Sequence, residues 1–172
     1  MRPINLRESE IALANNTLID SNSTYEDLGL TVYPKVGVNP SLWKNLRKQV
    51  KTDFPKVDLK EPFIITGLVD IVKSSNLENG LGFEFNELTE VYNAPILSKG
   101  DGKFNSDNQG LQKKGLPTKL NKKGTRMLYT ANYGVRRLCR GRYLDLNFGV
   151  DDLVESYDGG RVHVIKNFQN RR

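Results

Sequence analysis

Hydrophobic and polar residues alternate over short stretches along most of this chain, and that alternation is typical of β-strands with one buried face. Val154–Tyr157 and Arg161–Ile165 flank the turn residues Asp158-Gly159-Gly160 and predict a β-hairpin. A second hairpin is predicted around Asn79-Gly80. The expected strands cover residues 28–33, 62–73, 81–86, 125–131 and 142–148, whereas 132–142 suits either a short helix or a turn.

Two segments carry the capping residues of helices. Asn39 followed by Pro40 is the clearest helix start in the chain, and this helix is expected to continue to about Thr52. Asn5 with Glu8 three residues later matches a capping box, which predicts a short helix near the beginning of the chain. We therefore expect one amphipathic helix in the domain and a short helix before it.

The elements together predict the domain organisation and the fold class. We expect a β-rich α+β fold, with a small antiparallel sheet or barrel of about five to seven strands and an OB-like or SH3-like barrel as candidates. Residues 1–27 are expected to be a flexible N-terminal arm, because their second half is rich in Asn, Ser and Thr. Residues 28–168 are expected to form a single globular domain that contains a long flexible basic loop at 98–124.

Composition excludes several classes of protein. The longest apolar run, 62–69, is far shorter than the roughly 20 residues that span a bilayer. The charged N-terminus does not resemble a secretory signal, so we expect a cytoplasmic protein with no membrane partner. One cysteine, Cys139, and one histidine, His163, cannot build a Cys/His zinc site, and the possible calcium loop that begins near Gly100 has Ser106 in place of the required glycine and Gln112 in place of the closing glutamate. No metal and no cofactor are therefore expected.

The charge of the chain is unevenly distributed. The net charge is +6, but residues 108–144 contain ten basic residues and no acidic residue, which leaves 16 basic and 20 acidic residues elsewhere. A block of one sign repels itself unless a partner neutralises it, and a polyanion is a common partner. The block therefore predicts contact with nucleic acid or another polyanion. Its residues are Lys113, Lys114, Lys119, Lys122, Lys123, Arg126, Arg136, Arg137, Arg140 and Arg142.

Two aromatic residues, Tyr129 and Tyr133, flank the turn that leads to the arginines of this block. Aromatic rings stack on bases while guanidinium groups hold phosphates, so the combination is typical of proteins that bind single-stranded DNA or RNA. We therefore predict a backbone-directed nucleic-acid-binding protein rather than an enzyme. Its predicted site consists of the ten basic residues together with Tyr129 and Tyr133, unless either ring packs in the core.

Three other interpretations stay open. In the first, the lysines form a solvated surface and the arginines pair with acidic segments of the same chain, such as 84–90. In the second, the protein has a structural role, and 1–27 and 98–124 become ordered against neighbouring subunits or an acidic partner. In the third, the arginines bind a small phosphorylated ligand, with or without catalysis. Cys139 is either a reactive thiolate among arginines or a small buried side chain.

Overall fold

The computed structural model describes residues 2–15, 17, 25–67, 70–73, 81–106, 114–141, 144–149, 160–161 and 164–165. The helices are α1 (Leu6–Ala14), α2 (Pro40–Asp53) and a short 3-10 helix at Pro95–Lys99. The strands are β1 (Arg2–Pro3), β2 (Tyr25–Val32), β3 (Phe63–Thr66), β4 (Asp70–Lys73), β5 (Leu81–Glu84), β6 (Glu90–Asn93), β7 (Gly102–Phe104), β8 (Arg126–Tyr129), β9 (Val135–Arg140), β10 (Leu146–Asn147), β11 (Gly160–Arg161) and β12 (Val164–Ile165).

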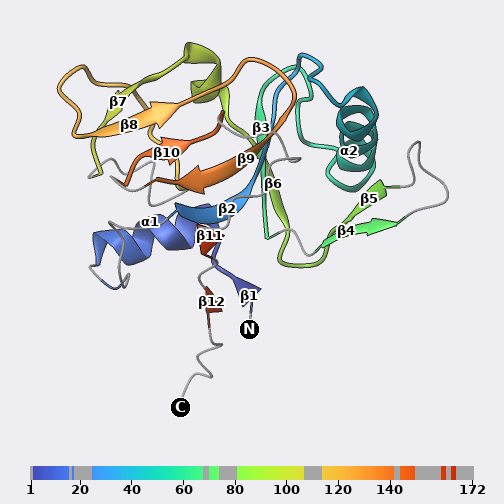
Figure 1. Cartoon of the computed structure of the whole chain (residues 1–172), viewed down its shortest axis with the longest axis horizontal. Helices are drawn as coiled ribbons and strands as arrows, with labels where there is room; N and C mark the ends of the chain where they lie inside the picture. The colour runs from blue at the N-terminus through green and yellow to red at the C-terminus, as the bar shows by residue number, and fades with distance from the viewer. Residues whose placement is uncertain are drawn as a thin grey trace.

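A mixed sheet forms the centre of the molecule (Figure 1). Its strand order is β6-β3-β2-β9-β10-β8-β7, and β11 pairs with the beginning of β2. The pairings of β10 with β8 and of β11 with β2 are parallel, and the others are antiparallel. The β-rich α+β class is confirmed, but the sheet is mixed rather than antiparallel. The edge strands β6 and β7 do not pair with each other within the described part of the chain, so the sheet is open, and neither a barrel nor an OB-like or SH3-like fold is shown.

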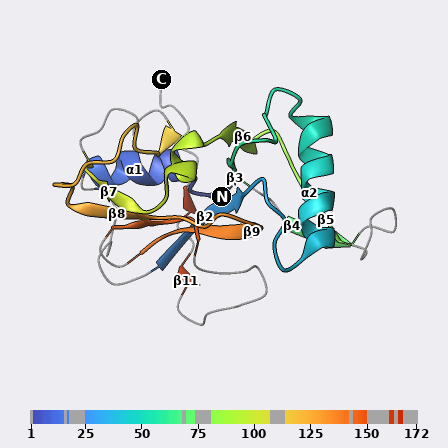
Figure 2. The ribbon, with the colours of Figure 1, turned by 90° about the horizontal axis from the view of Figure 1, so that it is seen from above.

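Hydrophobic side chains from the two faces of the sheet build two separate cores. On one face, Leu6 of α1 packs with Leu128, Leu138 and Phe148. On the other face, α2 packs with Val32, Phe63 and Val135 through its buried residues Leu46 and Val50. Figure 2 shows α1 lying along one face of β2, β8 and β9, with α2 beside β4 and β5. No helix in the described ranges is long and apolar enough to cross a membrane.

Both helices begin where the capping residues predict. The Asn5 side chain accepts a hydrogen bond from the backbone N–H of Glu8 at 2.9 Å, and the Glu8 carboxylate accepts one from the N–H of Asn5 at 3.1 Å. The Asn39 side chain accepts a hydrogen bond from the N–H of Leu42 at 3.1 Å. These bonds satisfy N–H groups that the helix itself leaves without partners, so the local sequence is enough to fix both starts.

The first part of the expected flexible arm is packed against the core of its own chain. Ile4 and Leu6 are buried, and a Cβ atom at Gly115 would lie only 2.4 Å from the Leu6 side chain. The expected loop 98–124 also contains ordered elements, because it includes β7 and the buried Leu116. Gly115 of the expected loop therefore lies directly against Leu6 of α1.

The segment 62–73 does not form the single central strand that its composition predicts. It divides at Gly67, where φ is +68° and an added Cβ atom would lie 2.4 Å from the Leu88 carbonyl oxygen. Its first half is β3 in the main sheet, and its second half is β4, which pairs with β5 in a separate two-stranded sheet. The predicted hairpin around Asn79-Gly80 is therefore confirmed for β4 and β5.

The chain after Tyr129 also differs from the prediction. The ambiguous segment 132–142 contains the strand β9, and among the described residues 144–148 only Leu146–Asn147 is strand. Of the predicted C-terminal hairpin, Val154–Tyr157 lies outside the described residues. The following residues pair with two different elements, since β11 lies beside β2 and β12 beside β1. The predicted hairpin itself stays a prediction, because its first strand lies outside the described residues.

Candidate functional site

Alternation along β9 divides the arginines of the basic block between the two faces of the sheet. Arg136 and Arg140 point to the same face as Leu138, which is fully buried in the core beside α1. Arg136 is only 6% exposed and Arg140 only 2% exposed. Arg137 lies on the other face, opposite Leu30, and is half-buried. Two arginines expected to contact backbone phosphates are therefore inside the molecule.

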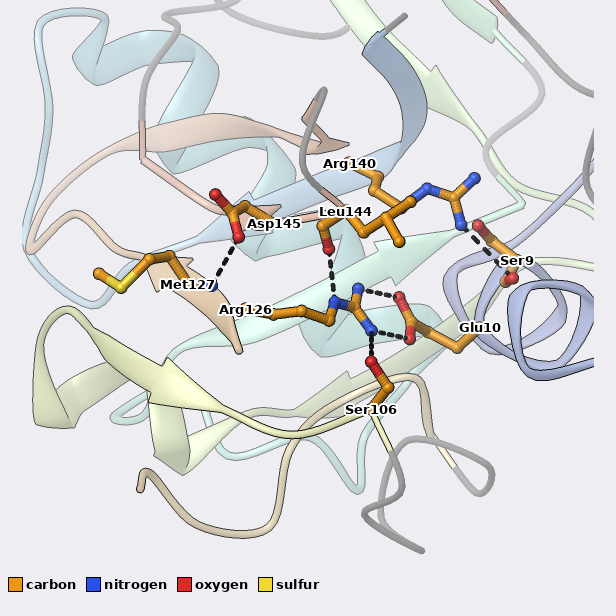
Figure 3. Close-up of polar contacts among 8 residues, drawn as sticks. All are labelled: Ser9, Glu10, Ser106, Arg126, Met127, Arg140, Leu144 and Asp145. Carbon is orange, nitrogen blue, oxygen red and sulfur yellow. Dashed lines mark hydrogen bonds and ion pairs between the residues drawn. The ribbon is translucent and has the colours of Figure 1, made fainter. Parts of the chain in front are cut away.

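Arg126 of β8 is buried in an ion pair with α1 (Figure 3). Its two terminal nitrogens donate to the Glu10 carboxylate at 2.7 and 2.8 Å, and its Nε donates to the Leu144 carbonyl at 2.6 Å. A longer bond of 3.4 Å reaches the Ser106 hydroxyl, and the guanidinium carbon lies 4.7 Å from the centre of the Phe104 ring. This bidentate geometry neutralises the charge of Arg126 within the chain.

The same helix also contacts Arg140. A terminal nitrogen of Arg140 donates to the backbone carbonyl of Ser9 at 3.5 Å (Figure 3). Ser9 and Glu10 are adjacent, so one turn of α1 covers both Arg126 and Arg140. Nearby, the Asp145 carboxylate accepts a hydrogen bond from the backbone N–H of Met127 at 2.6 Å, which joins the segment before β10 to β8.

The interpretation that arginines pair within the chain is confirmed for Arg126, but its partner Glu10 is not one of the carboxylates expected from 84–90. The expected carboxylates, Glu84, Glu87 and Glu90, are all exposed. They belong to β5, β6 and the residues between, at the opposite end of the sheet from β8 (Figure 1). The partner Glu10 belongs instead to the segment for which we expected a flexible arm.

The two tyrosines do not form one stacking platform. Both are 37% exposed, so neither is buried in the core. Tyr129 lies opposite Asn147 in the sheet, on the face away from Leu128. Tyr133 stacks instead on Arg136, whose guanidinium carbon is 4.5 Å from the ring centre and whose Nε donates to the Tyr133 carbonyl at 3.3 Å.

The described lysines of the block are exposed, in contrast to the arginines. They are Lys114, Lys119, Lys122 and Lys123, whereas Lys113 and Arg142 lie outside the described residues. Lys114 is apart from the others, because its carbonyl accepts the hydroxyl of Tyr92 at 2.8 Å and its ammonium lies 5.7 Å from that ring. Burial raises the pKa of Tyr92, which keeps its hydroxyl protonated as the donor.

Three of these lysines lie beside the edge strand β7. The Asn121 N–H donates to the Lys103 carbonyl at 2.7 Å, and a Cβ atom at Gly124 would lie 2.4 Å from the Phe104 backbone nitrogen. Lys103 is also exposed and lies opposite Met127, so it shares a face of the sheet with Tyr129. We call Lys103, Lys119, Lys122, Lys123 and Tyr129 the lysine surface.

The predicted site did not include Lys103, because this residue precedes the basic block. The sequence does contain one signal that arginines would be buried, which the prediction did not use. Arg136, Leu138 and Arg140 occupy every second position, so a strand that buries Leu138 also buries its two basic neighbours. Cys139 is buried as well, in agreement with the interpretation of a small buried side chain.

Comparisons with known proteins give no family for this chain. No protein-family model, no curated protein and no solved structure matches it. The arrangement of its side chains therefore carries the functional argument.

Proposed function

We propose that this protein binds single-stranded nucleic acid through the lysine surface, by contact with the phosphate backbone. The observation that carries the proposal is the separation of the two basic residue types: the buried arginines support the fold, while the lysines beside β7 stay exposed. The proposal thus keeps the expected class of ligand, leaves the arginines out of the predicted site and adds Lys103 to three of its lysines and Tyr129.

Charge near β7 supports this assignment. Lys122 and Lys123 are adjacent in a tight turn, in which the Asn121 side chain accepts a hydrogen bond from the N–H of Lys123 at 3.0 Å, and both side chains are exposed. Asp101, which directly precedes β7, already accepts the N–H and the hydroxyl of Thr130 at 2.7 and 3.1 Å. Clustered ammonium groups attract phosphates and release their counterions on contact.

Tyr129 supplies the second component of such a surface. It lies on the same face as Lys103 and presents part of its ring to solvent. A base that stacks on an exposed tyrosine contributes about 1–3 kcal/mol whatever its identity. Lysines along the strand edge and one ring beside them favour binding with little sequence preference.

The test is the salt dependence of binding to a labelled thymidine oligonucleotide, followed by fluorescence anisotropy. A variant with alanine at Lys103, Lys119, Lys122 and Lys123 should bind more weakly, and the slope of log affinity against log salt should decrease by about 3. Circular dichroism checks that the variant remains folded, as the exposure of all four side chains predicts.

The matched control replaces four exposed lysines on and after α2, namely Lys48, Lys51, Lys56 and Lys60, and changes the net charge equally. This control should keep nearly the native slope. Equal losses in both variants would show attraction by net charge alone, and no binding at low salt would remove the proposal.

A further inference from the structure

A cleft with a volume of about 780 Å³ lies at one end of the sheet. Most of its wall comes from three segments: the residues that follow β2, the 3-10 helix with the residues after it, and the loop between β8 and β9 with the start of β9. Pro62 and Gly149 also line it. Hydrogen bonds join two of these walls, since the Gly134 N–H donates to the Lys35 carbonyl at 2.7 Å and the Tyr33 N–H donates to the Gly134 carbonyl at 2.9 Å. These two walls are therefore joined to each other by backbone hydrogen bonds.

A nearly buried guanidinium lines this cleft. Arg136 is held by its stacking on the Tyr133 ring and by the bond from its Nε to the Tyr133 carbonyl. Both residues contribute to the cleft wall, and Tyr133 keeps more than a third of its surface exposed. The cleft thus combines a fixed positive charge with an accessible aromatic ring.

Further charges decide which class of ligand the cleft suits. Lys35 lines the same cleft and is exposed, so its ammonium adds a second positive charge. Asp101 is the acidic residue among the lining residues, and its Oδ1 already accepts both hydrogen bonds from Thr130. Guanidinium and ammonium groups together are typical of phosphate sites.

We infer that this cleft binds a phosphate monoester that carries a planar ring, as a mononucleotide does. The phosphate interacts with Lys35 and Arg136, and the ring packs against the exposed part of Tyr133. The volume falls within the range of small-molecule sites and exceeds what a phosphate ion alone fills. The lysine surface is a separate site, since Lys103, Lys119, Lys122 and Lys123 are not among the described residues that line the cleft.

Calorimetric titration of the full chain with adenosine monophosphate tests the inference, with adenosine and inorganic phosphate as partial probes. We expect the monophosphate to bind more tightly than either probe. Lys35→Ala and Tyr133→Leu should each weaken its binding about tenfold, because one loses a charged contact and the other a stacking surface. Both side chains are exposed, so the variants should fold.

Lys60→Ala is the control, because it removes an exposed lysine outside the cleft, and it should leave the affinity unchanged. The variant with four alanines in the lysine surface should also keep its affinity for the monophosphate, which separates this site from the proposed nucleic-acid surface. Absent binding, equal affinity in Lys35→Ala and the native chain, or equal binding of either partial probe would overturn the inference. Loss of monophosphate binding in the four-alanine variant would overturn it as well.

Discussion

At the scale of single residues, arginine and lysine have different roles in this chain. The guanidinium of Arg126 has a planar set of donors that matches one carboxylate and one carbonyl, so it is buried with partners. Lys122 and Lys123 have flexible side chains with a strongly hydrated ammonium, and they stay at the surface. Counting basic residues therefore overestimates how much positive charge is available to a ligand.

Glu10→Gln should lower the free energy of unfolding by about 3–5 kcal/mol, because it leaves the buried charge of Arg126 without a carboxylate. Urea denaturation measures the change. Glu61→Gln, which alters an exposed carboxylate, should change the stability little. A similar small effect at both positions would contradict the role assigned to the Glu10–Arg126 pair.

The Tyr33 hydroxyl predicts a dependence of stability on alkaline pH. It donates to the Phe148 carbonyl at 3.0 Å and accepts the Ala131 N–H at 2.9 Å, and burial raises its pKa from 10.0 to about 12. The folded state favours the protonated phenol, so this contribution is complete below pH 10 and is lost as the pH rises toward 12.

Tyr33→Phe should therefore be about 1–3 kcal/mol less stable than the native chain at neutral pH. This difference should shrink as the pH rises from 10 to 12, and urea denaturation at a series of pH values measures it. Other groups that titrate in this range affect both proteins and cancel in the comparison. A constant difference across the range would contradict the raised pKa.

At the scale of elements, β2 depends on a glycine at an irregular position. The register of β2 against β9 shifts between Asp27 and Gly29, and Gly29 has φ of +145°. An added Cβ atom would lie 2.2 Å from the Ile65 carbonyl oxygen on β3. A side chain at this position would therefore separate two central strands of the sheet.

Gly29→Ala should lower the free energy of unfolding by at least about 3 kcal/mol, because backbone strain and overlap with Ile65 add together. Gly100→Ala is the matched control, since Gly100 also has positive φ, at +79°, but an added Cβ atom meets nothing within 4 Å. The control should lose less, about 1–3 kcal/mol, because it carries the backbone strain without the overlap. Thermal unfolding followed by circular dichroism compares the two, and equal losses would show that the close approach to Ile65 has no effect.

At the scale of the whole molecule, α1 is part of the domain. Leu6 is buried in the core on one face of the sheet, while Trp43 packs against the core on the other face. Because β2 and β9 contribute side chains to both cores, the two faces should unfold together. The single tryptophan then reports on a change made at the far side of the sheet.

Leu6→Ala should lower the free energy of unfolding by about 2–5 kcal/mol and shift the midpoint seen by Trp43 fluorescence. Leu88→Ala, at an exposed leucine, should leave this midpoint nearly unchanged. A fluorescence midpoint that does not move in Leu6→Ala would mean that α1 unfolds independently, as an arm would.

Local features of the sequence predicted the local features of the structure. Asn5 and Asn39 mark the starts of the helices because a cap satisfies N–H groups within three residues of itself. Alternation located the second half of β2, where Leu30 and Val32 point to the same core, since a strand with one buried face repeats every second residue. The ion pair of Glu10 with Arg126 joins residues 116 positions apart, and no local pattern contains such a contact.

The sequence by itself determined where the helices start, most of the strand positions and the concentration of basic residues in 108–144. Tertiary structure alone decided which basic residues are covered. The two faces of β8 and β9 differ because α1 packs against one of them. On that face Glu10 forms an ion pair with Arg126, and the Ser9 carbonyl accepts a hydrogen bond from Arg140. The physical reason is that burial depends on long-range packing, whereas capping and alternation depend on neighbours in the chain.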